Sequence, residues 1–199
     1  MRPAAQFTGT GYANLVASYV VHNFGHRGIT VYREVPIGKT MIGKNRRMDI
    51  FVLEEATRIA MAIECKYQDS AGTADEKIPY ALADVQQLGM PALIAYAGTG
   101  FSDGILHMLA ASPYAAHCLP DPDTLAPTDA TRELDATLAR TFRWWDLVVR
   151  GGPGCRRASE TGHQSLWRAA RLRPPHLTGD DHRAVRRPPR QRRLTGQEE

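Results

Sequence analysis

The spacing of apolar residues along the first part of the chain predicts one helix and then four strands. Residues 12–24 place apolar side chains three or four positions apart, which predicts a helix with one buried face. Short apolar or β-branched segments at 29–35, 47–53 and 58–66 are typical of strands. The run at 91–98 is apolar throughout, as in a strand that is buried on both faces.

A helix is expected between the third and fourth of these strands. Thr73 and Glu76 have the spacing of a capping box, Thr-x-x-Glu, which marks a helix start. Proline disrupts a helix interior, so Pro79 favours a regular helix that begins nearer Ile78. Residues 103–112 predict a second, shorter helix after the fourth strand.

After residue 112 the sequence predicts a loop and then a last helix. Pro and Asp are frequent at residues 113–128, as in a loop. The following helix carries four apolar residues on one face: Leu134, Leu138, Phe142 and Trp145. The first three strands suit an antiparallel meander, and the helix before the fourth suits a crossover to a parallel partner. The elements together predict an α/β fold, a mixed sheet with helices on both faces.

Composition and charge change at Gly151. Residues 151–199 hold eleven arginines, no lysine and five acidic residues, a balance of +6, whereas residues 1–150 hold 14 basic and 16 acidic residues, a balance of −2. The overall charge of +4 therefore does not mark the folded part as a general nucleic-acid binder. We expect a domain at 1–150 and a disordered tail at 151–199. The tail is either an arm that attracts nucleic acid or the translation of a shifted reading frame.

The sequence also argues against several classes of protein. It has no apolar run near the roughly 18 residues of a membrane span, and its first residues lack the apolar core of a signal peptide. Its three cysteines, Cys65, Cys118 and Cys155, fit neither a zinc spacing nor a disulfide framework. We therefore expect a cytoplasmic protein without membrane partners.

Three charged residues interrupt the apolar pattern of the second and third strands. With a turn centred between Ala56 and Thr57, residues whose numbers sum to 113 lie opposite each other, so Asp49 faces Glu64. Lys66 follows two positions later on the face of Glu64. Opposed carboxylates in a sheet repel each other, and a divalent cation between them would remove that cost.

The residue types suggest which cation and which chemistry. Carboxylate oxygens favour Mg²⁺, with Mn²⁺ as the alternative. Phosphodiester hydrolysis needs such a metal and a group that positions or deprotonates the attacking water, a task that suits Lys66. The alternative is a strand-end ion pair of Lys66 with Glu64 or Asp49, which leaves one carboxylate unexplained.

Asp49, followed by Glu64-Cys65-Lys66 at the end of the next strand, resembles the PD-(D/E)XK nuclease superfamily. Members of that superfamily share the restriction-endonuclease-like fold, with a mixed sheet in an αβββαβ core, and the resemblance covers roughly residues 8–112. It implies that Asp49 and Glu64 bind Mg²⁺ with the backbone carbonyl of Cys65, and that Lys66 serves the water.

The resemblance extends to Gln68 and has two departures. Gln68 matches a residue that several branches place near the scissile phosphate. Met48 precedes Asp49 where the motif name has proline, a position that the family varies. Many members carry a metal-binding Glu on the first helix, where this chain offers Asn14.

The function that these observations favour is a metal-dependent nuclease acting on DNA, of the kind found in restriction, repair or mobile-element systems. Two alternatives stay open: a catalytically inactive nucleic-acid-binding module of the same fold, and a metal-dependent hydrolase of another phosphate ester. A homodimer is one oligomeric state that the sequence leaves open. Phosphate contacts are expected from basic residues that are otherwise solvated: Lys39, Lys44, Arg46, Arg47 and Lys77.

Overall fold

The computed structural model describes residues 7–70 and 74–150. Thr73, and with it the predicted capping box, lies outside the described residues, as does the predicted tail at 151–199. No helix in the described segments has the length and apolar character that crossing a bilayer requires.

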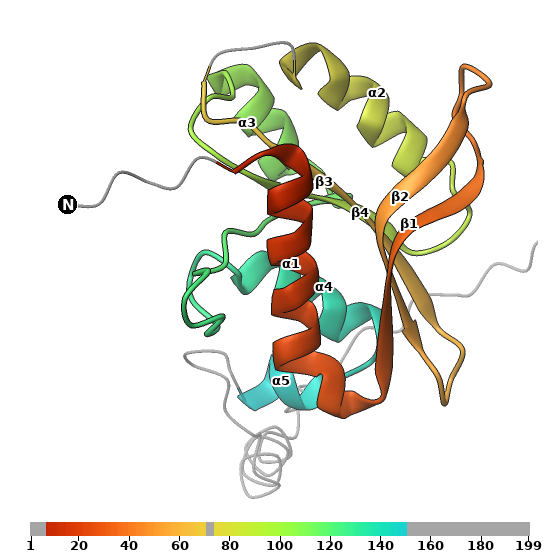
Figure 1. The fold of residues 1–199 in the computed structure, drawn as a ribbon, viewed down its shortest axis with the longest axis vertical. Helices are drawn as coiled ribbons and strands as arrows, with labels where there is room; N and C mark the ends of the chain where they lie inside the picture. The colour runs from red at the N-terminus through yellow and green to blue at the C-terminus, as the bar shows by residue number, and fades with distance from the viewer. Residues whose placement is uncertain (1–6, 71–73, 151–199) are drawn as a thin grey trace, which may run out of the picture. The chain divides into compact units, whose positions relative to one another are not determined.

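The described elements form a mixed sheet with helices on both faces (Figure 1). In chain order they are α1 (Gly9–Phe24), a 3₁₀ turn η1 (Gly25–Arg27), β1 (Ile29–Lys39), β2 (Asn45–Glu54), β3 (Ala60–Tyr67), α2 (Ala74–Gln86), β4 (Ala92–Ala97), α3 (Asp103–Ala111), β5 (Ala115–His117), α4 (Arg132–Thr141) and α5 (Trp145–Arg150). The sheet order is β1-β2-β3-β4-β5, antiparallel from β1 to β3 and parallel from β3 to β5. The predicted meander and parallel crossover are confirmed.

Two apolar clusters lie on the two faces of the sheet. One cluster packs α1, α4 and the residues after α4 against the sheet, and the other packs α2 and α3 against the opposite face. The side chains of β3 alternate between them: Met61, Ile63 and Cys65 belong to the α1 side, and Ala62 belongs to the α2 side. β3 is thus the central strand through which both cores are joined.

The start of α2 differs from the prediction. The helix begins at Ala74 and includes Pro79, rather than beginning nearer Ile78. Tertiary contacts hold its first turn: the Asp75 carboxylate accepts the backbone N–H of Ser102 (3.1 Å), and Ile78 is fully buried. These contacts offset the backbone hydrogen bond that proline cannot donate.

The segment after α3 differs in two further ways. The predicted loop contains β5, which is too short to have a periodic signal and pairs in parallel with β4. The predicted last helix is broken where Arg143 takes a positive φ of 60°. The break turns Trp145 outward, 54% exposed, so its predicted place on the buried face is wrong. Trp144 is buried instead and stacks on Phe142 with ring centroids 4.9 Å apart.

Candidate active site

The antiparallel ladder between β2 and β3 has the register predicted from the turn. The paired residues end with Ile50 opposite Ile63, and in every pair the two residue numbers sum to 113. Continued by one position, the same register places Asp49 opposite Glu64. The two carboxylates therefore come from neighbouring strands at the end of their shared ladder.

The ladder of backbone hydrogen bonds ends at this point because a side-chain oxygen replaces the next backbone acceptor. In the observed register the next backbone bond would join the Cys65 N–H to the Met48 carbonyl. The Cys65 N–H instead donates to Asp49 Oδ2 at 2.7 Å. The Asp49 carboxylate thus sits in the gap where β2 and β3 separate.

β2 rotates about its own axis at Asp49. Simple alternation would place Met48 and Ile50 on one face, yet Met48 packs in the α2-side core and Ile50 in the α1-side core. On the neighbouring strand β1, Glu34 is the residue that this register places opposite Asp49, and it has a positive φ of 55°. The rotation buries Met48 and Ile50 in the cores on opposite faces of the sheet. Asp49, between them, is left at the strand gap.

Lys66 and Glu64 form a close ion pair next to Asp49. Lys66 Nζ lies 2.5 Å from Glu64 Oε1, and both side chains are about three-quarters buried. Each carboxylate uses one named oxygen in these contacts, Oδ2 of Asp49 and Oε1 of Glu64. The structure therefore brings Asp49, Glu64 and Lys66 together, and it also contains the ion pair of the alternative interpretation.

Burial dominates the electrostatics of both carboxylates. It raises the pKa of Asp49, although the hydrogen bond from Cys65 and the charge of Lys66 act to lower it. Burial likewise raises the pKa of Glu64; Lys66 opposes that shift and Asp49 adds to it. In both groups burial disfavours the charged form, and the neighbouring Lys66 cation favours it.

The Cys65 carbonyl points toward the same gap. The even-numbered residues of β3 bond toward β4, as the Ala62 N–H does to Pro91 O at 3.0 Å, whereas the Cys65 N–H points to Asp49. The N–H and C=O of one residue in a strand share an edge, so the Cys65 carbonyl faces β2. Within residues 7–70 and 74–150 no three His, Cys, Asp or Glu side chains form a metal-binding group. The Cys65 carbonyl is thus one further oxygen beside the two carboxylates, and waters would complete the coordination of a bound Mg²⁺.

Arg33 on β1 supports Asp49 from the α1 side, a residue that the sequence analysis did not single out. Its Nε donates to the Asp49 carbonyl at 2.7 Å, and its Nη1 donates to Asn14 Oδ1 on α1. Asn14 is thus held by an arginine. A charged residue within a short β-branched strand was the available signal, the same one that drew attention to Asp49.

Gln68 occupies a structural position at the end of β3. Its side chain is buried, and Nε2 donates to Asp75 Oδ1 (3.1 Å) and to the Gly100 carbonyl (2.6 Å). The amide therefore joins β3 to the start of α2 and to the loop after β4. A role for Gln68 near a scissile phosphate stays a prediction, and both of its N–H groups already have protein acceptors.

A pocket between the β1–β2 hairpin and α2 contains Glu64 and Lys66 together with predicted phosphate-binding residues. Arg46, Arg47 and Lys77 line it beside them. Arg47 is 64% exposed and lies 3.7 Å from Glu34, a loose surface contact. Glu64, Lys66 and three basic residues therefore border one cavity, whose lining does not include Asp49.

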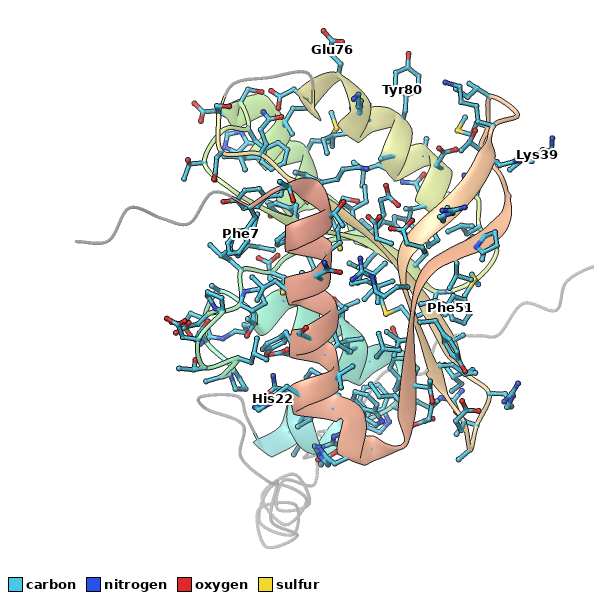
Figure 2. All side chains as sticks on the ribbon, in the orientation of Figure 1. Phe7, His22, Lys39, Phe51, Glu76 and Tyr80 are labelled. Atoms are coloured by element: carbon cyan, nitrogen blue, oxygen red, sulfur yellow. The ribbon has the colours of Figure 1, made fainter. Side chains whose placement is uncertain are left out.

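The remaining predicted contacts differ in accessibility. Lys39 and Lys44 are exposed near the end of the hairpin, and Figure 2 shows Lys39 pointing outward. Arg46 is only 8% exposed and pairs with Asp84 of α2 at 2.7 Å. A phosphate contact by Arg46 would require this pair to open.

Comparisons with known proteins give a family and little else. A sequence model described as a PD-(D/E)XK nuclease superfamily domain matches residues 8–145. A crystal structure described as "Protein of Unknown Function AF1548" is 16% identical, covers 79% of this chain and 78% of its own, and aligns with a TM-score of 0.37. No curated protein matches significantly. The family match spans well over half of the chain, and its range includes every residue of the Asp49, Glu64 and Lys66 group. The chain belongs to the PD-(D/E)XK nuclease superfamily, and its described residues have the mixed αβββαβ sheet core of the restriction-endonuclease-like fold.

Proposed function

We propose that this protein is a divalent-metal-dependent nuclease that hydrolyses phosphodiester bonds in DNA. The observation that carries the proposal is the group of Asp49, Glu64 and Lys66 at the point where β2 and β3 separate. It belongs to a chain of a nuclease superfamily, which makes phosphodiester hydrolysis the first chemistry to consider. DNA, rather than another phosphate ester, is favoured by Arg47 and Lys77, which line a pocket together with Glu64 and Lys66.

The donor atoms at the strand gap fit a hard divalent cation. Asp49 and Glu64 each supply carboxylate oxygen, and the Cys65 carbonyl points to the same gap. Burial raises the pKa of both carboxyl groups, and a cation bound between them would stabilise their charged forms. A bound Mg²⁺, or Mn²⁺ in its place, would neutralise phosphate charge and lower the pKa of the attacking water.

Lys66 and Arg33 act as cationic groups from the protein itself. In the proposed reaction the Lys66 ammonium leaves Glu64 and holds the attacking water by hydrogen bonding, on the side of the sheet covered by α2. Arg33 is a positioning residue, because its Nε fixes the Asp49 backbone and its Nη1 fixes Asn14. With Asn14 held by Arg33, the proposed site uses one metal ion.

The basic residues of the hairpin and of α2 would hold the DNA backbone. Arg47 and Lys77 border the pocket that contains Lys66, and Lys39 and Lys44 lie further along the hairpin. Phosphate contacts of this kind orient the duplex without reading its sequence. A DNA strand that enters the pocket would bring one phosphate to the strand gap.

The test of this function is incubation with supercoiled, linear double-stranded and single-stranded DNA. We expect cleavage with Mg²⁺ or Mn²⁺, no cleavage with EDTA, and a loss of at least 100-fold in Glu64→Gln, because that change removes a charged ligand and keeps the size of the side chain. The control is Glu55→Gln, at an exposed position in the turn between β2 and β3.

Two results would favour the alternatives. Metal-independent DNA binding without cleavage of any DNA form would identify a catalytically inactive binding module. Cleavage of a small phosphate ester with no activity on DNA would identify a hydrolase of another class. Either result would reject the proposed function.

A further inference from the structure

The turn of the β1–β2 hairpin, residues 40–44, exposes two large apolar side chains and is called here the hairpin tip. Met41 is 53% exposed and Ile42 is 71% exposed. Figure 1 shows that the hairpin extends beyond its neighbours in the sheet and runs beside α2. Isolated apolar residues are common on protein surfaces. These two differ in where they lie and in how the turn that carries them is held.

The hairpin tip has a defined shape. The Thr40 N–H donates to the Lys44 carbonyl (2.8 Å), and the Gly43 N–H donates to the Thr40 carbonyl (2.9 Å). Gly43 supplies the left-handed φ of 78° that this tight turn requires. Met41 and Ile42 are therefore presented by a closed turn.

The hairpin tip is also braced against α2. Asp84 Oδ1 accepts the Met41 N–H at 2.9 Å, and the same oxygen lies 2.7 Å from the buried guanidinium of Arg46. A buried charge pair of this kind is costly to break from one side. The backbone of the hairpin tip is thus held to α2 at Met41 before any partner binds.

Charge and continuity indicate the partner. Lys39 and Lys44 flank the apolar pair, and residues 39–44 contain no acidic residue. Thr40 of the hairpin tip lines the same pocket as Glu64 and Lys66, and so does Tyr80, which is 70% exposed and points away from α2 in Figure 2. A ligand that passes from the hairpin tip to the candidate catalytic group would meet cations and apolar surface together.

We propose that the hairpin tip is a wedge that inserts Ile42, supported by Met41, between stacked base pairs of duplex DNA, while Lys39 and Lys44 hold the flanking phosphates. The proposal rests on the proposed function and adds a substrate feature to it: the duplex is unstacked beside the bond that is cut. Proteins that kink DNA insert Met, Ile, Leu or Phe in this way. Steps that unstack easily, such as TA, would therefore be preferred.

The experiment uses full-length protein and duplexes with 2-aminopurine at successive positions, because the fluorescence of this base rises when it unstacks. Binding is measured with Mg²⁺ in the Lys66→Ala background, so that the DNA stays uncut. We expect a several-fold rise in fluorescence at one step. Adding Ile42→Ser is expected to abolish the rise and weaken binding about 10-fold, whereas adding Val21→Ser, a change of an apolar residue on α1 that is 52% exposed, should leave both unchanged.

The outcomes separate the wedge from the proposed nuclease function. Duplex binding with no rise in fluorescence, or an equal rise in the Ile42→Ser protein, overturns the wedge while wild-type cleavage of DNA still supports the function. Absence of both DNA binding and cleavage overturns the two together. If sedimentation shows a wild-type oligomer that Ile42→Ser dissociates, the hairpin tip is a protein interface and the wedge is rejected.

Discussion

Lys66→Ala is expected to reduce DNA cleavage by about 100- to 1,000-fold, the range that the loss of one preorganised hydrogen-bond donor costs. Lys66 lies 2.5 Å from Glu64, and its charge also acts on Asp49. In the proposed reaction Lys66 holds the attacking water and does not bind the DNA. The rate of plasmid cleavage at saturating protein is therefore the measurement that changes.

Binding distinguishes this role from a structural one. Lys66→Ala should leave Mg²⁺-dependent DNA affinity within a few-fold of wild type, and it should not weaken metal binding, because the ammonium no longer competes for Glu64. The matched control is Arg58→Ala, which breaks an exposed ion pair in the turn between β2 and β3. Loss of DNA binding in parallel with cleavage would instead make Lys66 a phosphate contact.

Gly98→Ala is expected to destabilise the fold by about 5 kcal/mol, at the upper end of single-substitution effects. Gly98 follows β4 with a φ of 111°, and a Cβ at this position would lie 2.1 Å from the Gln68 carbonyl oxygen. That carbonyl cannot yield easily, because it accepts the Gly100 N–H at 2.7 Å. Chemical denaturation followed by circular dichroism would measure the loss.

Gly104→Ala provides the control for Gly98→Ala. Gly104 lies in α3, its φ is not positive, and a Cβ there meets nothing within 4 Å. The change should stabilise the protein by about 0.5–1 kcal/mol, since alanine is the better helix former. If both variants unfold at the same denaturant concentration, the close approach of β4 to the end of β3 is not a constraint on the fold.

The strand register was predictable because the turn between β2 and β3 is short and the faces of β3 alternate cleanly. Small and large residues separate along β3, with Met61 and Ile63 on one face and Ala62 on the other. A shift of one residue would have reversed these faces, so the pattern specified the pairing. The position of Asp49 opposite Glu64 followed from this register.

The local breaks in periodicity could not be predicted. The rotation of β2 at Asp49 sends Met48 and Ile50 into different cores, although both are apolar and two residues apart. The positive φ of Arg143 likewise places Trp144 in the core and leaves Trp145 exposed. Each break is stabilised by contacts between distant segments, which a periodic pattern does not encode.

The same limit applies to the supporting residues of the candidate site. Arg33 reaches Asp49 and Asn14 from a different strand, and no spacing in the sequence predicts that contact. The position of Gln68 after Lys66 matched a position of the family. Its hydrogen bonds, however, go to Asp75 and Gly100, which lie in other segments of the chain. The residues on adjacent strands were predictable, and those that join several elements were not.

Mn²⁺ binding, followed by the loss of the free-ion signal in electron paramagnetic resonance, tests the central claim most directly. The account predicts one bound ion per wild-type chain, affinity at least 10-fold weaker in Asp49→Asn and in Glu64→Gln, and wild-type affinity in Asp103→Asn, which changes an exposed carboxylate at the start of α3. Equal Mn²⁺ affinity in the wild type, Asp49→Asn and Glu64→Gln would contradict it, because the carboxylates at the strand gap would then not be metal ligands.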